Sequence, residues 1–124
     1  FEFAIHRMGK RVDNIIIVND VVFVVEFKVG EGGYEKHAIE QVIDYTIDLK
    51  NFHEGSHHTK LIPILVATNA SIINQTSSDI LIYKTAAKTN KDNLSDTIQI
   101  FVNSDNIPID IEYWEKSIYK PTPT

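Results

Sequence analysis

The sequence of 124 residues contains no cysteine, so disulfide bonds and thiolate metal ligands are excluded. A chain without cysteine suits a reducing compartment, and we expect a cytoplasmic protein. The sequence also lacks an apolar run of the length that a transmembrane helix needs. We therefore expect no association with a membrane.

Positive charge is scarce as well. Lys and Arg number 12 against 17 Asp and Glu, which gives a formal net charge of −5 at pH 7. A domain that grips nucleic acid mainly by bulk electrostatics needs clustered basic residues to neutralise phosphates. The charge argues against that class, but not against an enzyme whose own carboxylates hold cations. The length and the 43% hydrophobic content predict one compact globular domain.

The first half of the chain has the clearest periodic signals. Residues 12–18 and 21–28 are β-branched and aromatic, and the intervening Asn-Asp pair tolerates the left-handed backbone of a tight turn, so we predict a β-hairpin. Apolar residues recur at helical spacing over 35–50, and 61–67 reads as a buried strand. This order predicts a right-handed crossover that places 61–67 parallel to 21–28.

The second half gives weaker signals. We predict strands at 79–83 and 97–102, on either side of a polar stretch, 84–95, that is either a helix or a loop. One short helix is expected over 111–119, before the prolines near the end of the chain.

The predicted hairpin sets two carboxylates opposite each other. Pairing of Val18 with Val21 makes the numbers of facing residues sum to 39, so Asp13 faces Glu26. Lys28 points to the same side as Glu26. Both faces of the hairpin are otherwise apolar, which predicts a central strand pair covered on both sides.

Facing carboxylates in a buried place repel each other. A shared proton, a salt bridge to Lys28 or a divalent cation would each relieve the repulsion. Mg²⁺ takes one or two carboxylates together with water and phosphate oxygens, and a neighbouring lysine can act on an attacking water. A salt-bridged triad with a purely structural role is the alternative, and spacing alone leaves both open.

Two motifs carry a family resemblance. Asp13 followed by Glu26-Phe27-Lys28 resembles the Asp…(Asp/Glu)-x-Lys signature of the PD-(D/E)XK, or restriction-endonuclease-like, nucleases. Gln41 and Tyr45 share one helical face and are similar to the Gln-xxx-Tyr motif of the RecB-like branch of that class.

The resemblance implies an α/β fold with a restriction-endonuclease-like central mixed sheet flanked by helices. It implies a Mg²⁺- or Mn²⁺-dependent phosphodiesterase acting on DNA or RNA. In that scheme Asp13 and Glu26 hold the metal, with the Phe27 carbonyl as a further ligand. Lys28 handles the attacking water, and the Gln-xxx-Tyr pair positions the nucleic-acid strand.

A wider resemblance covers most of the chain. The matching residues are 10–13, 25–28, 63–68 and 119–124, together with His37, Gln41-Val42 and Tyr45. They are similar to the nuclease-like region that precedes a superfamily-1-type helicase ATPase in bacterial proteins, some of them related to Schlafen-type helicases. It implies a downstream ATPase or helicase domain as a partner. The chain has no Gly-x-x-x-x-Gly-Lys-Ser/Thr loop, so no ATPase activity is assigned to it.

The same resemblance divides the chain into a nuclease-like domain, 1–119, and the start of a linker, 120–124. The nuclease class usually adds a Glu from a helix upstream of the Asp strand. Glu2 instead stands in a strand-like context, so either that helix lies upstream of the given sequence or the position is not used.

Two rival functions differ in kind. One is a catalytically inactive nucleic-acid-binding or docking module of a helicase. The other is a zinc peptidase, because His53 to His57 spells the His-Glu-x-x-His pattern. Gly55 and Ser56 weaken any helix there, and we interpret the segment as a surface loop.

His37 and the C-terminal aromatic residues each have both a functional and a structural interpretation. His37 lies four residues before Gln41 and can approach the metal site, but a helix-start residue that meets solvent or a carbonyl is favoured. Trp114, with Tyr113 and Tyr119, can stack on bases, but an aromatic patch that docks the C-terminal segment onto the core, or onto a missing domain, is favoured.

Overall fold

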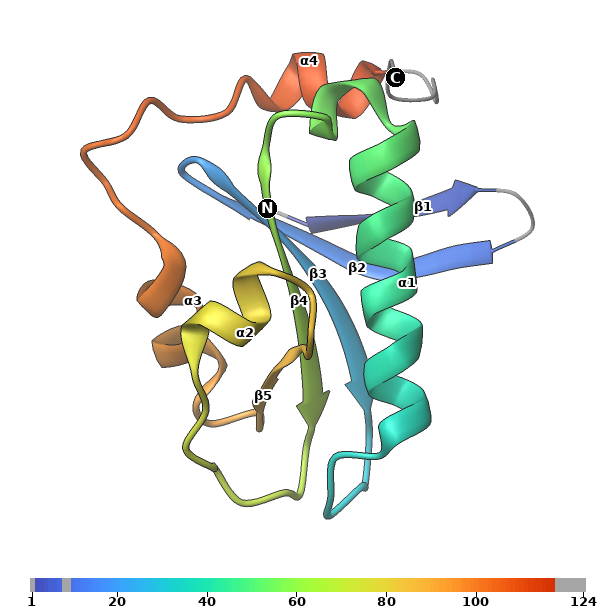
Figure 1. The fold of residues 1–124 in the computed structure, drawn as a ribbon, viewed down its shortest axis with the longest axis vertical. Coiled ribbons are helices and arrows are strands. Elements are labelled where there is room, and N and C mark those ends of the chain that lie inside the picture. Colours follow the sequence, from blue (N-terminus) through green and yellow to red (C-terminus); the bar gives the residue numbers. More distant parts are fainter. Residues whose placement is uncertain (1, 8–9, 118–124) are drawn as a thin grey trace.

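The computed structural model describes residues 2–7 and 10–117; for 2–7, 10–13 and 115 only the main chain is considered. A five-stranded mixed sheet with strand order β1-β2-β3-β4-β5 forms the centre, flanked by helices (Figure 1). The expected α/β class with a central mixed sheet is confirmed.

The strands are β1 (Glu2–Arg7), β2 (Lys10–Val18), β3 (Val21–Lys28), β4 (Lys60–Ala67) and β5 (Ala87–Thr89). The helices are α1 (Lys36–Phe52), α2 (Ser77–Leu81), α3 (Leu94–Phe101) and α4 (Ile111–Lys116), with a 3₁₀ turn at Glu54–Ser56. None of the helices that the structure describes has both the length and the apolar character needed to cross a bilayer.

The predicted hairpin is present. β2 and β3 are antiparallel, and Asn19 takes the left-handed conformation (φ 54°) that the tight turn requires. The pairs from Asn14–Val25 to Val18–Val21 keep the predicted sum of residue numbers. The turn sequence therefore fixes which residues of the two strands face each other.

The predicted crossover is also confirmed. β4 is parallel to β3, from Val21–Lys60 to Lys28–Ala67, and α1 runs back along the sheet between them (Figure 1). Pro63 lies inside β4, but β5 pairs with β4 only from Ile64 onward. Its missing N–H would point to the β5 side, where no strand partner has yet begun, so the proline costs the sheet little.

The sheet is covered on both faces, as the apolar hairpin predicted. The α1-side cluster consists of Ile15, Ile17, Val22, Val24, Val42, Leu49, Leu61, Ala86 and Trp114. The α3-side cluster consists of Val21, Phe23, Val25, Ile62, Ile64, Val66, Ile80, Ala87 and Phe101. Successive β3 residues thus enter opposite clusters.

The strands predicted at 79–83 and 97–102 are wrong, because both segments are helical. In α3, Thr97 and Phe101 are buried while Ile100 is 63% exposed, which is a helical spacing and not the alternation of a strand. In α2 only Ile80 is buried, and Leu81 faces solvent. The isoleucines of these segments favoured strands through their β-propensity. In the folded chain, tertiary packing instead buries one face of a helix in each segment.

A short strand, β5, was missed inside the polar stretch 84–95. Three residues carry too little pattern to reveal a strand. The outer side of β5 is closed by a side chain: the Gln75 amide accepts from the Lys88 N–H (2.7 Å) and donates to the Lys88 carbonyl (2.8 Å). A side-chain amide therefore takes the place of a further strand at this position.

The C-terminal segment crosses the hairpin turn before it reaches α4. The Asn19 amide donates to the carbonyls of Asn103 (2.8 Å) and Asn106 (3.2 Å), and the Ile109 N–H donates to the Asn19 carbonyl (2.8 Å). The helix expected over 111–119 is observed as α4. Residues 118 and 119 and the predicted linker start at 120–124 lie outside the described residues.

Candidate functional site

Glu26 and Lys28 lie at the carboxyl end of β3. Val22 and Val24 belong to the α1-side cluster, so strand alternation places Glu26 and Lys28 on the same face, toward α1. Glu26 is buried, with 5% of its surface exposed, and Lys28 is half-buried. A carboxyl group held this far from water needs either a proton or a charge-stabilising environment.

Asp13 lies on β2, the neighbouring strand. The observed register ends at Asn14–Val25, and one further residue in that register puts the Asp13 backbone opposite Glu26. The side chain of Asp13 lies outside the described residues. Its predicted role as a metal ligand stays a prediction.

The Phe27 carbonyl is directed toward β2. The Thr68 N–H donates to the Lys28 carbonyl on the β4 side (3.2 Å). Main-chain groups of successive strand residues point to opposite neighbours, so the Phe27 carbonyl points to the β2 side. The Phe27 side chain packs against the α3-side cluster, away from Glu26.

Gln41 and Tyr45 lie together on α1. The Gln41 amide donates a hydrogen bond to the Tyr45 hydroxyl (3.2 Å), both residues are half-buried, and Tyr45 packs against the α1-side cluster. They line a cavity of about 290 Å³ with three more residues of α1, namely His37, Glu40 and Asp44. The structure thus brings the two motif residues into contact with each other.

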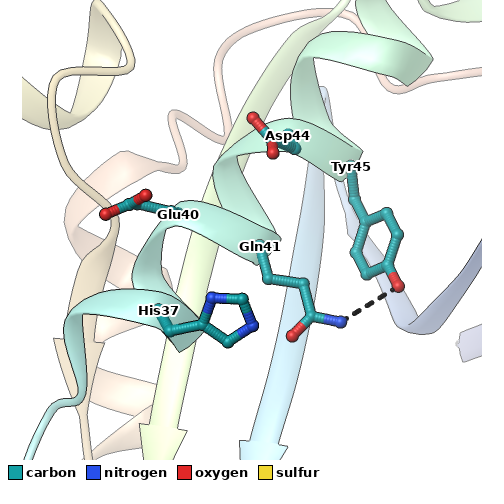
Figure 2. A pocket seen from close by; sticks show the side chains of 5 residues that line it. All are labelled: His37, Glu40, Gln41, Asp44 and Tyr45. Carbon is teal, nitrogen blue, oxygen red and sulfur yellow. Dashed lines mark hydrogen bonds between the residues drawn. The ribbon is translucent and has the colours of Figure 1, made fainter.

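The cavity has two chemically different sides. Figure 2 shows His37, Gln41 and Tyr45 pointing to one side of α1, and the carboxylates of Glu40 and Asp44 pointing to the other. The acidic pair was not predicted as part of the site. Helical spacing could have found it, because Glu40 and Asp44 follow His37 by three and seven residues.

The donor chemistry at the end of β3 fits a hard divalent cation. The Glu26 carboxylate and a carbonyl directed toward β2 are oxygen donors of the kind Mg²⁺ and Mn²⁺ take. Among the side chains that the structure describes, no group of three or more His, Cys, Asp or Glu is placed to hold a metal. The predicted set has two protein carboxylates, one of which is Asp13.

The His53–His57 segment is not the surface loop that was predicted. It forms a 3₁₀ turn in which His53 is 3% exposed and Ser56 is fully buried. The indole N–H of Trp114 donates to the Ser56 hydroxyl (2.7 Å), whose oxygen lies 2.9 Å from His53 Nδ1. Because α4 covers this turn, His53 and Ser56 are withdrawn from solvent, while Glu54, Gly55 and His57 stay half-buried.

This arrangement shapes the surroundings of the His53 ring. An indole N–H can only donate, so the Ser56 oxygen accepts from Trp114, while the direction of the hydrogen bond between Ser56 and His53 Nδ1 depends on the tautomer of His53. Burial lowers the pKa of His53 to about 4, with a smaller lowering from His57 and an opposing rise from a hydrogen bond to the Trp114 main chain.

Of the two favoured alternatives, docking onto the core is the one that Trp114 adopts. It is fully buried in the α1-side cluster, and its ring centroid lies 4.6 Å from that of His53. Tyr113 points outward, with 56% of its surface exposed. Ser56 and Trp114 are 58 residues apart in the chain, and no sequence signal linked them.

Comparison of the chain with protein-family models, with curated proteins and with solved structures gave no match. A function can therefore be inferred only from the residues of β2, β3 and α1 themselves.

Proposed function

We propose that the chain is a metal-dependent nuclease domain that hydrolyses phosphodiester bonds of DNA or RNA and works within a larger helicase or ATPase protein. The observation that carries the proposal is the buried Glu26 carboxylate, two residues before Lys28 on one sheet face and beside the strand that bears Asp13. The motif resemblance and the Gln41–Tyr45 contact add support.

Asp13, Glu26 and the Phe27 carbonyl would hold Mg²⁺ or Mn²⁺. The bound ion would polarise the phosphate and favour ionisation of an attacking water. The Lys28 ammonium orients that water or stabilises negative charge developing on the phosphate. Gln41 and Tyr45 hold the strand so that its phosphate meets these groups.

The test is cleavage of labelled single- and double-stranded DNA and RNA with Mg²⁺ or Mn²⁺. Lys28→Ala should lower the rate about a hundredfold to ten-thousandfold, because it removes the acid–base or charge-stabilising group. Lys84→Ala, at an exposed lysine, is the matched control and should keep the wild-type rate. Equal rates in Lys28→Ala and wild type would contradict the proposed role of Lys28.

A measurement of metal binding distinguishes the proposed metal ligands from Lys28. Titration calorimetry with Mn²⁺ should show binding to Lys28→Ala, because the lysine is not a ligand. Asp13→Ala should lose binding, and Glu26→Gln should lose most of it, because each removes one of only two carboxylates.

A docking module without catalysis is the second candidate. The specific observation in its favour is a cavity of about 260 Å³ bordered by the partly exposed Ile72, Ile73 and Ile100. Exposed apolar groups around a cavity are typical of protein contacts. A chain that binds nucleic acid but neither binds Mn²⁺ nor cuts any substrate would favour this function over the nuclease.

A further inference from the structure

His37 continues the Gln41–Tyr45 pair by one helical turn. The three residues are spaced at i, i+4 and i+8 on α1, line one cavity, and point to the same side in Figure 2. Gln41 and Tyr45 are half-buried and tied to each other by a hydrogen bond, whereas His37 is exposed. His37 is therefore the member of the row with the most surface available to a ligand.

The position of His37 along the sheet gives the row a direction. β3 ends at Lys28, and α1 begins at Lys36 and runs back over β3 and β4 (Figure 1). His37 thus belongs to the end of α1 nearest the carboxyl end of β3, where Glu26 and Lys28 lie. A nucleic-acid strand that followed this row of side chains from Tyr45 to His37 would run toward the carboxyl end of β3.

The carboxylates beside this row disfavour a phosphate chain on their edge of the same helical face. The Glu40 and Asp44 carboxylates point away from the row, and both residues are exposed. The salt bridge of Glu40 to Lys36 is 3.9 Å long and solvent-exposed, so it neutralises little. Phosphates are repelled on the acidic side and meet imidazole, amide and hydroxyl groups on the other.

We propose that His37 is a third positioning residue, which donates a hydrogen bond to the nucleic-acid backbone next to Gln41 and Tyr45, and that Glu40 and Asp44 confine the strand to this row. The proposal rests on the proposed nuclease function and deepens it. It names a single strand as the ligand, because a row on one helix face offers one line of contacts along one phosphate chain.

Binding is measured apart from cleavage, in the Lys28→Ala background with Mg²⁺. The probes are fluorescently labelled oligothymidylate and oligouridylate, followed by anisotropy. His37→Ala should weaken binding about tenfold, because a hydrogen bond to a charged group is lost. His37→Gln keeps a donor and should recover most of the affinity, and His58→Ala, at an exposed histidine elsewhere, is the control.

Neutralising the carboxylates of Glu40 and Asp44 should strengthen binding, whereas loss of His37 weakens it. The double variant Glu40→Gln/Asp44→Asn should bind about threefold more tightly than the charge-matched control Glu112→Gln/Asp105→Asn, whose two carboxylates are exposed and far from α1 in the chain. In the chain with Lys28 intact, His37→Ala should raise KM and leave kcat nearly unchanged, because the residue positions the strand without touching the reacting atoms.

The outcomes are distinguishable. Equal affinities of His37→Ala and His58→Ala overturn the role of His37, and equal affinities of the two double variants overturn the acidic border. A chain that binds neither oligonucleotide overturns the whole contact row. If the chain with Lys28 binds and does not cleave, the nuclease proposal fails, while the variant affinities still decide the contact row.

Discussion

The two ends of α1 carry similar polar side chains in opposite circumstances. At its start, His37 is exposed and Gln41 and Tyr45 line an open cavity. Just beyond its end, His53 and Ser56 are buried beneath Trp114, and each has a hydrogen bond inside the protein. A histidine next to one helix can thus be a ligand contact or a structural element, and burial with internal hydrogen bonds is what separates the two.

The difference also decides between two motifs in the sequence. His-Glu-x-x-His matched a known metal motif, yet its first histidine is buried against an indole ring. Gln-xxx-Tyr is a weaker pattern, yet both of its residues line a cavity on the side of the sheet to which Glu26 belongs. The sequence already disfavoured the zinc motif through Gly55 and Ser56, and the burial of His53 agrees with that.

Removal of Trp114 should have the largest effect on stability. Trp114→Ala should lower the free energy of unfolding by about 3–5 kcal/mol, because it empties a fully buried site and removes the donor to Ser56. Trp114→Phe keeps most of the ring and should cost about 1–2 kcal/mol. Urea unfolding followed by circular dichroism measures both, and equal losses in the two variants would show that packing does not dominate.

The buried histidine should make stability depend on pH. The pKa of His53 is lowered to about 4 in the folded chain, so between pH 6.5 and about 4 the unfolded chain binds a proton that the folded chain does not. The free energy of unfolding should therefore decrease as the pH is lowered through this window, by roughly 3 kcal/mol. His53→Gln should remove this part of the slope, and an unchanged slope in that variant would assign it to other groups.

A substitution at the start of α1 should affect substrate binding more than stability, the opposite of a substitution at Trp114. Gln41→Ala removes a half-buried hydrogen bond and should change the free energy of unfolding by less than about 1 kcal/mol. The same change should raise KM for a nucleic-acid substrate about tenfold, because it removes a strand contact. A large loss of stability with unchanged KM would make the pair structural, like His53 and Ser56.

Much of the sheet could be predicted because local patterns and tertiary packing agree there. The hairpin followed from period-2 alternation around a turn that accepts a left-handed residue, and α1 and β4 followed from their apolar spacing. The two isoleucine-containing segments of α2 and α3 were mistaken for strands, because their β-propensity is overridden by packing.

Some features of the candidate site could likewise be predicted from the sequence, and others could not. The common face of Glu26 and Lys28 follows from strand alternation, and the Gln41–Tyr45 contact follows from helical spacing. The burial of His53 and Ser56 did not follow, because its cause is a tryptophan 58 residues further along the chain. Long-range contacts of this kind leave no periodic trace in a sequence.

The most direct test of the central claim is anomalous diffraction from crystals of the chain grown with Mn²⁺. The account predicts one peak between the carboxylates of Asp13 and Glu26, with metal–oxygen distances of about 2.1 Å to each and the Phe27 carbonyl as a further ligand. A saturating Mn²⁺ soak that leaves this position without a peak, or that places the only ordered ion at the His53–His57 turn, would contradict it.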